Sequence, residues 1–264
     1  MKKFLVIGNP IDHSLSPILH NHWIKENNLK CLYEKRLLEL NDLKSIISEI
    51  KSNKITGANV TVPFKRSIIP FVDVLTESAK KTNSVNTLYK LGEEVWGDNT
   101  DWIAFKKSLN EFNFDISGKK IFILGAGGVT SSIIYALEND TEKILVTNRT
   151  KSKTKELKEQ FPSIEILDWG KLPTDFDIII NTTSVGLKKN EKIDLNLSNY
   201  KNKFFYDVIY SPPLTNFLLE AKKSDNQIKN GMEMFLYQAQ ASFKIWHGFL
   251  PIIDEKTLKL LNND

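Results

Sequence analysis

The chain has 264 residues, of which 41% are hydrophobic, 26% charged and 10% aromatic. This is the composition of an ordinary globular protein, and it excludes a disordered chain and a collagen-like repeat. The formal net charge of +4 is spread along the whole sequence, so it gives little support to a polyanionic partner, and we expect no binding to nucleic acid.

Cysteine and histidine usage argues against disulfides and metal sites. The single cysteine, Cys31, cannot form an internal disulfide, and the four histidines lack the spacing of a zinc site. The apolar run 4–7 is too short for the core of a signal peptide, and no run of about 18 apolar residues is present to span a bilayer. We therefore expect a soluble, cytoplasmic protein without a metal ion and without a membrane partner.

Short β-type segments alternate with helical patterns along almost the whole chain, which predicts an α/β fold with mostly parallel sheets. In the first hundred residues, strands are predicted at 3–7, 31–36, 57–62, 85–89 and 94–96. Helices are predicted at 17–27 and 42–51, with a weaker helical pattern at 73–80. Ser16 before Pro17 is typical of a helix N-terminus that has a capping serine and a proline in the first helical position.

A more regular series follows a predicted helix at 101–112. Helices are predicted at 129–138 and 152–160. Strands are predicted at 120–124, 143–147, 164–167, 176–181, 204–208 and 227–229. Six strands in this order suit a Rossmann-type, doubly wound nucleotide-binding sheet. The last predicted helix, 232–247, is apolar nearly all round, so we expect it to be buried between layers.

A domain boundary is predicted near residue 100, where this regular series begins. We expect residues 1–100 together with about 236–264 to form one α/β domain, and residues 101–235 to form the second. A cleft between two such domains is a common place for a substrate and a cofactor to meet.

The glycines Gly125, Gly127 and Gly128 lie between a predicted strand and a predicted helix. A diphosphate can approach a helix N-terminus only where no Cβ blocks it, and the free N–H groups there attract anions. Thr130 stands where the fingerprint G-x-G-x-x-G has its third glycine, so the motif is incomplete. The turn therefore indicates a dinucleotide site, and the alternative is a glycine turn that binds no nucleotide.

The end of the next strand indicates which dinucleotide. NAD-binding sheets carry an acidic residue about 20 residues after the glycines, where it binds the ribose 2′-hydroxyl. Residues 146–153 contain no carboxylate there, and instead carry Arg149, Lys151 and Lys153 beside two threonines. Such a group suits the 2′-phosphate of NADP, whereas the alternative is a solvated basic helix start.

Polar residues follow several strands of the first half. Ser14 and Ser16 beside a helix N-terminus have the chemistry to hold a carboxylate, although simple capping by Ser16 would explain them as well. Lys65 comes just after the strand 57–62, where an isolated lysine is usually a solvated surface residue. Two further polar clusters lie at 83–87 and 97–101, at strand ends, where α/β sheets tend to place their ligands.

Taken together, these segments resemble the shikimate dehydrogenase family. The resemblance runs in family order from residue 8 to about residue 248, and the first two stretches are its most specific part. The matching stretches are GNPIDHSLSP, GANVTVPFK, SVNT, DNTD, LGAGGV, NRT, NTTSVG, YDVIY and GMEMFLYQAQ. The resemblance implies that the protein reduces 3-dehydroshikimate to shikimate with NADPH, in the chorismate and aromatic amino-acid pathway.

The resemblance also implies roles for individual residues. Lys65 and Asp101 match the catalytic pair of the family. The expected substrate-binding residues are Ser14, Ser16, Asn59, Thr61, Asn86, Tyr210 and Gln238. The expected cofactor-binding residues are Glu77, Gly125, Ala126, Gly127, Gly128, Val129, Asn148, Arg149, Thr150, Lys153, Val208 and Gly231. From the residues alone, Gln238 could equally be polar filler on an apolar helix, and Tyr210 plain core packing.

The sequence departs from the family pattern at three places. Trp102 stands where a glycine usually follows the NTD motif, and Asn83-Ser84 replaces the common Gly-Ala before Val-Asn-Thr. Lys153 replaces the second arginine of the phosphate clamp, which keeps the charge but loses the bidentate geometry. These changes bear on domain closure and on the strength of the NADP preference.

Two other functions remain open at this stage. One is a quinate/shikimate dehydrogenase that uses NAD, and the other is a non-catalytic sensor of shikimate-pathway metabolites. Retention of both Lys65 and Asp101 argues against a sensor. Either residue of this pair could carry the proton that accompanies hydride transfer. We expect a monomer or a homodimer whose partners are small molecules.

Overall fold

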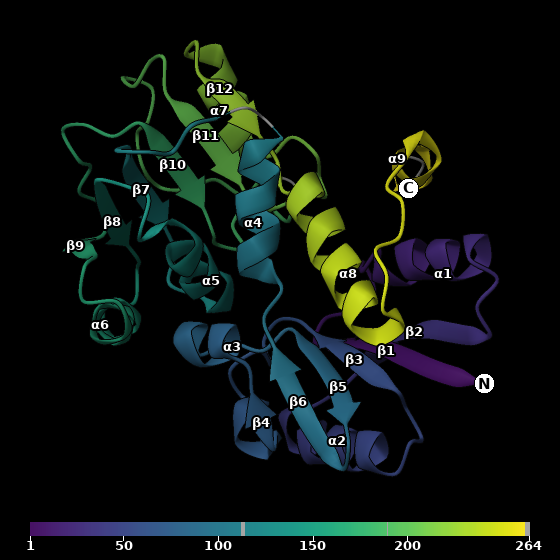
Figure 1. Ribbon diagram of the computed structural model, residues 1–264. Coiled ribbons are helices and arrows are strands. Elements are labelled where there is room, and N and C mark those ends of the chain that lie inside the picture. Colours follow the sequence, from purple (N-terminus) through teal and green to yellow (C-terminus); the bar gives the residue numbers. More distant parts are fainter. Residues whose placement is uncertain (112–113, 189, 262–264) are drawn as a thin grey trace. The chain divides into compact units, whose positions relative to one another are not determined.

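The computed structural model describes residues 1–111, 114–188 and 190–261. The chain divides into two compact units, Met1–Asp101 with Leu236–Asp264, and Trp102–Phe235 (Figure 1). Each unit is built on its own six-stranded sheet. None of the helices in the described part of the chain is long and apolar enough to cross a membrane.

The first unit carries a mixed sheet with the strand order β2-β1-β3-β5-β6-β4. Its strands are β1 (Lys2–Gly8), β2 (Cys31–Leu37), β3 (Gly57–Val60), β4 (Val74–Leu75), β5 (Thr87–Leu91) and β6 (Glu94–Asp98). Its helical segments are α1 (Ser16–Glu26), η1 (Leu40–Asp42), α2 (Leu43–Lys51), η2 (Ile69–Phe71), α3 (Glu77–Thr82) and α9 (Glu255–Leu261). Helices α4 (Asp101–Asn110) and α8 (Met232–His247) have residues in both units.

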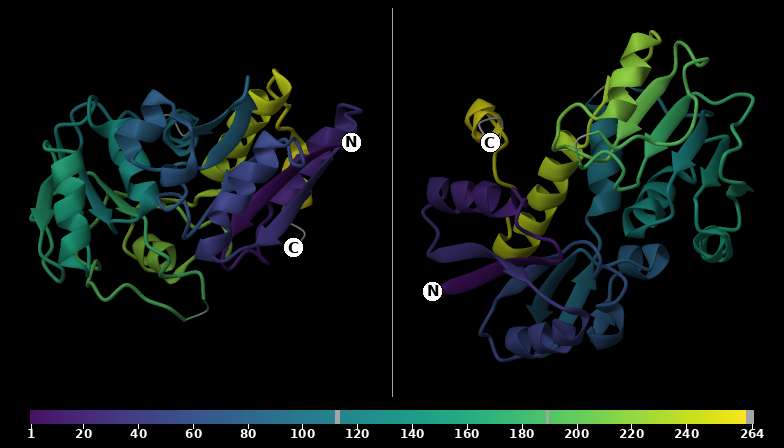
Figure 2. Two further views of the ribbon diagram at one scale, coloured as in Figure 1. Left: turned by 90° about the horizontal axis from the view of Figure 1, so that it is seen from below. Right: turned by 180° about the vertical axis from the view of Figure 1, so that it is seen from behind.

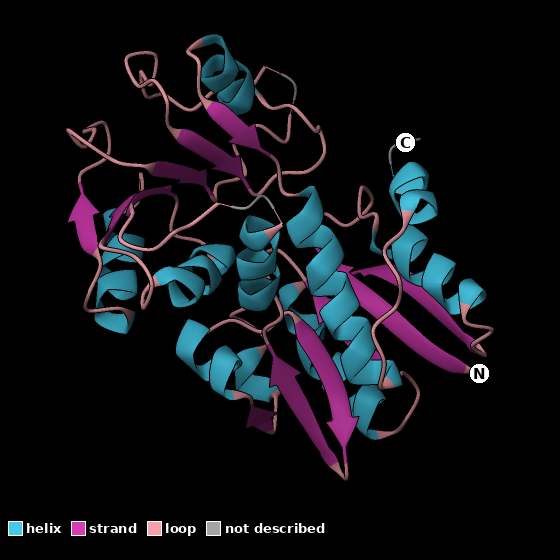
Figure 3. Cartoon of the chain, turned by 45° about the horizontal axis from the view of Figure 1, so that its top comes forward, coloured by secondary structure: helices cyan, strands magenta, loops and turns pink. Residues whose placement is uncertain are grey.

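The first sheet is less parallel than we expected. Strand β5 pairs antiparallel with both β3 and β6, and Figure 3 shows the strands of this hairpin running in opposite directions. Only Gly92 and Glu93 separate β5 from β6, and a two-residue connection can join only antiparallel strands. Gly92 adopts a positive φ of 62°, as such a tight turn requires.

Both faces of this sheet are covered. On one face, the apolar stripe Leu43, Ile46, Ile47 and Ile50 of α2 packs in one cluster with alternate residues of β1. On the other face, rings from α1 and α8 pack on the sheet, for example Trp246 against Phe4 at 4.8 Å between ring centroids. Helix α9 contacts α1 (Figure 2).

The second unit carries an all-parallel sheet with the order β12-β11-β10-β7-β8-β9. Its strands are β7 (Lys120–Leu124), β8 (Lys143–Thr147), β9 (Glu165–Leu167), β10 (Ile178–Asn181), β11 (Phe204–Asp207) and β12 (Gln227–Lys229). Its other helices are α5 (Gly128–Leu137), α6 (Lys151–Gln160) and α7 (Asn216–Lys223). This order is that of a doubly wound sheet, whose switch point lies between β7 and β10.

Several predicted elements differ from the structure. Strand β3 ends at Val60 rather than at residue 62, because the chain turns there and the Phe64 amide donates to the Thr61 carbonyl at 2.9 Å. The pattern at 73–80 is the short strand β4 followed by α3, which is capped by the Thr76 hydroxyl. Helices α7 and α9 were not predicted. Helix α4 ends at Asn110, and residue 112 of the predicted helix lies outside the described residues.

Helix α8, which we expected to be buried between layers, is buried at only part of its residues. Met234, Phe235, Leu236, Ala239 and Phe243 are buried, others are half-buried, and Lys244 is the first exposed residue along the helix. Gln238 and Ser242 depart from this apolar character and lie one turn apart on the helix. Both take part in the polar network described next.

Candidate active site

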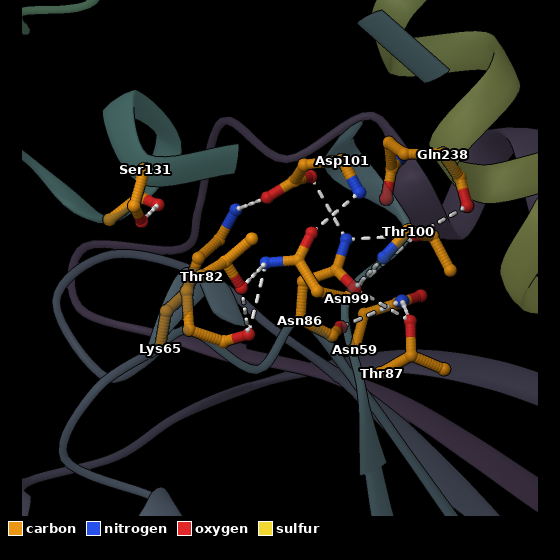
Figure 4. Close-up of polar contacts among 12 residues, drawn as sticks. Asn59, Lys65, Thr82, Asn86, Thr87, Asn99, Thr100, Asp101, Ser131 and Gln238 are labelled. Carbon is orange, nitrogen blue, oxygen red and sulfur yellow. Dashed lines mark hydrogen bonds and ion pairs between the residues drawn. The ribbon is translucent and has the colours of Figure 1, made fainter. Parts of the chain in front are cut away.

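Lys65 and Asp101 form an ion pair in the first unit. The Lys65 Nζ donates to the Asp101 Oδ2 at 2.6 Å, although the two residues lie 36 positions apart (Figure 4). Their side chains are only 15% and 6% exposed, so Lys65 is not the solvated surface lysine that its position alone would suggest. The Lys65 carbonyl accepts from the Val85 amide at 2.8 Å, which ties the turn after β3 to the segment before β5.

Two asparagine side chains hold Asp101. The second carboxylate oxygen, Oδ1, accepts from the Asn86 side-chain amide at 2.9 Å, and the Asp101 backbone N–H donates to the Asn99 Oδ1 at 3.0 Å. The Asn99 amide donates in turn to the Ser84 carbonyl at 2.9 Å and to the Thr82 hydroxyl at 3.1 Å. Asp101, the first residue of α4, is therefore held by Lys65 and Asn86 at its carboxylate and by Asn99 at its backbone N–H (Figure 4).

Asn86 is held on both sides of its amide group. Its Nδ2 donates to the Thr100 Oγ1 at 2.9 Å as well as to Asp101, and its Oδ1 accepts from the Thr100 amide at 2.8 Å. The Thr87 hydroxyl also donates to this oxygen at 3.0 Å. Because the polar atoms of Asn86 are satisfied within the unit, its orientation is defined before any ligand binds.

Asn59 and Gln238 join the same network. The Asn59 Nδ2 donates to the backbone carbonyl of Asn86 at 3.1 Å and to the Ser242 hydroxyl at 2.9 Å. The Gln238 carbonyl accepts from the Thr100 and Ser242 hydroxyls at 3.1 and 3.0 Å, so helix α8 is attached to the segment before α4 (Figure 4). These bonds are made by the Gln238 backbone, and the role of its side chain stays a prediction.

The segment 9–16, which carries Ser14 and Ser16 and is called the serine loop below, follows the carboxyl end of β1. Thr61 follows the carboxyl end of β3. Gly8 is required there, because a Cβ on it would come within 2.5 Å of the Thr61 methyl group. Helix α1 begins at Ser16 with Leu15 as its cap residue, so the alternative that Ser16 is an N-cap is wrong. The Ser14 hydroxyl instead accepts from the Ser16 amide at 3.4 Å. Ser14 and Thr61 are half-buried, and Ser16 is buried.

The glycine turn of the second unit has the geometry of an anion site. Gly125 needs its positive φ of 116°, and a Cβ on it would lie 2.5 Å from the Thr182 hydroxyl. A Cβ on Gly127 would instead meet no atom within 4 Å, so the space in front of the α5 N-terminus is open. Thr130, at the place of the missing third glycine, accepts from the Gly127 amide at 2.9 Å and thereby shapes the turn.

Basic side chains follow β8 next to this turn. Arg149 and Lys153 are exposed, and neither forms an ion pair with the residues that the structure describes. Lys151 pairs with Asp168 at 3.1 Å. The Thr147 hydroxyl is buried without a partner among the described residues, and the Thr147 carbonyl accepts from the Gly125 amide at 2.8 Å. The open space at Gly127, the unpaired cations and this orphaned hydroxyl fit a phosphorylated dinucleotide.

The remaining predicted residues divide between the two units. Val208 and Gly231 lie together in the second unit, and the Tyr210 ring stacks on Phe235 at 4.4 Å between centroids. Glu77 is an exposed residue at the start of α3, in the first unit, whereas the other predicted cofactor-binding residues belong to the second.

Four residues with clear places in these networks are not among the predicted site residues. Thr100 and Ser242 connect the amides of the first unit, and Tyr33 donates to the Asn59 Oδ1 at 2.7 Å. In the second unit, Asp207 is fully buried and accepts from Asn181, Ile209 and Thr215; burial raises the pKa of its carboxyl to about 6. Only the YDVIY stretch could have drawn attention to Asp207, and no motif points to Tyr33.

The described residues contain no group of three or more His, Cys, Asp or Glu side chains that could hold a metal ion.

Two family models match the chain. The model of the shikimate dehydrogenase substrate binding domain matches residues 6–88, and the model of shikimate / quinate 5-dehydrogenase matches residues 106–208. A shikimate dehydrogenase (NADP(+)) of Pelagibacter ubique (strain HTCC1062) is 53% identical over 263 residues, which cover 99% of each chain.

Solved structures agree with this relationship. Shikimate dehydrogenase from Aquifex aeolicus is 35% identical and has a TM-score of 0.90, with 100% of this chain and 98% of that chain covered. Shikimate 5-dehydrogenase from Thermus thermophilus, in complex with NADP(H) and shikimate, is 28% identical and has a TM-score of 0.88, with 98% and 97% covered. These findings confirm the two-domain α/β fold and the family that the motifs indicated: the chain belongs to the shikimate dehydrogenase family.

Proposed function

We propose that the protein is an NADP-dependent shikimate dehydrogenase, which reversibly reduces 3-dehydroshikimate to shikimate in chorismate and aromatic amino-acid biosynthesis. The observation that carries this proposal is the Lys65–Asp101 pair, joined at 2.6 Å and shielded from most of the solvent. A charged donor and acceptor fixed side by side can bind a hydroxyl-bearing ring and move a proton at its oxygen. The relatives from Pelagibacter ubique and Thermus thermophilus are likewise named dehydrogenases of shikimate.

The substrate carboxylate would be bound at the serine loop. Ser14 is half-buried, and because its oxygen accepts from the Ser16 amide, its own proton is available for an anion. Thr61 adds a further hydroxyl beside Gly8. We assign no arginine to the carboxylate, so we expect hydroxyl groups to bind it, and we expect Asn86, Asp101 and Gln238 to be directed at the ring hydroxyls.

Lys65 is the group that we assign to proton transfer. Its ammonium has three N–H donors, and Asp101 uses one of them, so others remain for the substrate oxygen. In the reduction, the carbonyl carbon accepts a hydride that the reduced cofactor supplies, and the oxygen accepts a proton from the Lys65 ammonium. The resulting amine regains its proton from solvent. Asp101 orients the ammonium and stabilises its charge during this step.

The second unit supplies the groups that would hold NADP. We assign the diphosphate to the open space at Gly127 and the α5 N-terminus, and the 2′-phosphate to Arg149 and Lys153. Tyr210 and Val208, at the end of β11, would contact the cofactor or the substrate near the reacting atoms. Glu77, at the start of α3, keeps its expected cofactor role in this proposal.

An initial-rate assay with two substrates and two cofactors tests the proposal. Purified protein should oxidise shikimate with NADP⁺ and should do so far more slowly with NAD⁺ or with quinate. Comparable rates with quinate and NAD⁺ would favour the quinate/shikimate dehydrogenase alternative. Shikimate binding without turnover under any of these conditions would favour a sensor.

Two finer expectations stay predictions alongside this function. A cytoplasmic location accords with a biosynthetic role and with the free, buried Cys31. A monomer or a homodimer is expected, and size-exclusion chromatography with light scattering distinguishes the two.

A further inference from the structure

Tyr33 is a buried residue of β2 that belongs to none of the predicted site residues. It is 1% exposed, and burial holds the pKa of its hydroxyl well above the usual range, with a hydrogen bond to the Ser16 side chain acting in the opposite direction. A tyrosine that is fully buried needs partners for its hydroxyl. The identity of these partners shows what the residue does.

Tyr33 attaches helix α1 to the sheet through its backbone and its ring. Its backbone N–H donates to the Asn21 Oδ1 at 3.0 Å, and its carbonyl accepts from the Asn21 Nδ2 at 2.8 Å. Its ring stacks on the His20 ring, with 4.2 Å between centroids and 3° between planes. Ser16 is the first residue of this helix, so these contacts fix the place of the serine loop against β2.

The Tyr33 hydroxyl also sets the orientation of Asn59. It donates to the Asn59 Oδ1 at 2.7 Å, and an amide oxygen can only accept. The Asn59 amino group therefore points the other way, where it donates to the Asn86 carbonyl at 3.1 Å and the Ser242 hydroxyl at 2.9 Å. With its amino group engaged in this way, Asn59 supports the backbone of Asn86.

The contacts form one continuous chain through the first unit. It runs from helix α1, which begins at Ser16 and is held by Tyr33, through Tyr33 and Asn59 to Asn86, whose amide donates to Asp101 at 2.9 Å. Its two ends are the group assigned to the carboxylate and the group assigned to the ring hydroxyls. A buried network of this kind, when fully satisfied, holds its members in one arrangement.

We propose that Tyr33 is a positioning residue that holds the carboxylate-binding serine loop and the hydroxyl-binding Asn86 in register, without touching the substrate. The inference rests on the proposed function, because it concerns the binding of the same hydroxy acid. In this role, the Tyr33 phenol group keeps two parts of the substrate site, the serine loop and Asn86, at a fixed separation.

The test is Tyr33→Phe, which keeps the ring stacked on His20 and removes only the hydroxyl. We expect the KM for shikimate to rise about tenfold, because the Asn59 oxygen loses its donor and the site loses its order. Because Lys65 and Asp101 remain paired, kcat should change by less than about threefold. The KM for NADP⁺ should stay the same, and calorimetry without cofactor should show the same loss of shikimate affinity.

Tyr200→Phe is the matched control. The Tyr200 hydroxyl donates to the Pro173 carbonyl at 2.6 Å in the second unit, so its removal costs a similar hydrogen bond away from the serine loop. Both variants should lose some thermal stability, and only Tyr33→Phe should lose shikimate affinity. An unchanged KM and affinity in Tyr33→Phe, or an equal change in both variants, would overturn the inference.

The two proposals can fail separately. If the wild-type chain binds shikimate without oxidising it, the proposed function is wrong, while the calorimetric comparison still decides the role of Tyr33. If the wild type oxidises shikimate and Tyr33→Phe binds it equally well, the proposed function holds and the positioning role is wrong.

Discussion

The backbone of Gly231 lies so close to Val208 that a Cβ on Gly231 would come within 2.1 Å of the Val208 carbonyl oxygen. Backbone atoms cannot yield as a side chain can, and the Gly231 amide also donates to the Ile209 carbonyl at 3.1 Å. The start of α8 and the end of β11 are therefore joined at a point where only glycine fits.

Gly231→Ala should therefore destabilise the protein whether or not a cofactor is bound. We expect a loss of at least about 3 kcal/mol in the free energy of unfolding, the upper range for a core that is overfilled. Gly127→Ala makes the contrast, because its Cβ would meet no protein atom within 4 Å. This second variant should unfold within about 1 kcal/mol of wild type, the usual range for substitutions without a buried contact.

The same pair separates structural glycines from ligand-binding ones. Gly127→Ala should raise the KM for NADP⁺ at least about tenfold, because its methyl group occupies the approach to the helix N-terminus. Denaturant titrations and initial rates on both variants check this. A Gly127→Ala variant with wild-type KM for NADP⁺ would remove the turn from the cofactor site.

A second prediction concerns cofactor choice. Arg149→Ala should raise the KM for NADP⁺ about 10- to 100-fold, because charge-assisted hydrogen bonds contribute roughly 1.5–3 kcal/mol. The KM for NAD⁺ should not change, since NAD⁺ lacks the 2′-phosphate. Lys153→Ala should have a smaller effect, because an ammonium binds phosphate as a point charge rather than through a planar fork.

Lys155→Ala serves as the control for this pair, because Lys155 is another exposed lysine of α6, two positions further along the helix. It should leave both Michaelis constants unchanged. If Arg149→Ala raised the Michaelis constants for NADP⁺ and NAD⁺ equally, the assignment of Arg149 to the 2′-phosphate would be wrong.

The second unit was the more predictable part of the fold. Strands β7, β10 and β11 are buried along most of their length, so each appears in the sequence as a short apolar run bounded by polar residues. The first unit was harder, because Thr61 and Val62 continue a β-type pattern past the true end of β3. The bond between the Phe64 amide and the Thr61 carbonyl, which turns the chain, leaves no periodic signal.

The candidate site divides along similar lines. The motifs indicated Lys65 and Asp101, and the fold brings these distant residues together at 2.6 Å. Tyr33 and Ser242 could not be found this way, because a tyrosine in a strand and a serine in an apolar helix look like ordinary packing residues. They meet at Asn59 only in the folded chain, across 26 and 183 positions.

A third prediction separates proton transfer from substrate binding. Lys65→Met keeps most of the side-chain volume but removes the ammonium, so kcat should fall about 10²- to 10⁴-fold, the range for a lost general acid or base. Shikimate should still bind with an affinity within about tenfold of wild type, since Lys65 supplies only part of the contacts. Stopped-flow kinetics and calorimetry measure the two quantities separately.

Lys90→Met is a control of matched burial for this variant. The Lys90 side chain is 16% exposed against 15% for Lys65, and its Nζ donates to the Lys51 carbonyl at 2.9 Å. It should lose stability without losing turnover. Full activity in Lys65→Met would transfer the proton role to Asp101 or to solvent.

The last prediction concerns the acid side of the stability profile and rests on His20. Burial lowers the pKa of its imidazole to about 3, and the charge of His247 acts in the same direction. The ring is 1% exposed and its Nε2 has no partner among the described residues, so the folded protein keeps it neutral. In the unfolded chain, the same imidazole binds a proton near its ordinary pKa of about 6.5.

The sign follows from the proton count. Between pH 6.5 and about 3 the unfolded chain binds a proton at His20 that the folded chain does not, so acid favours unfolding there. Well below pH 6.5, this single group should reduce the free energy of unfolding by about 1.4 kcal/mol per pH unit. Above pH 6.5 its contribution is constant. His20→Phe keeps a flat ring against Tyr33 and should remove this slope.

Urea titrations of wild type and His20→Phe at several values between pH 4 and pH 8 measure the effect as a difference. The difference should be flat above pH 6.5 and should shift steadily in favour of the variant below it, because only the wild type has the buried imidazole at position 20. If the free energies of unfolding of wild type and His20→Phe ran parallel over the whole pH range, the folded protein would accommodate the charged imidazole. The assignment of a neutral buried ring would then be wrong.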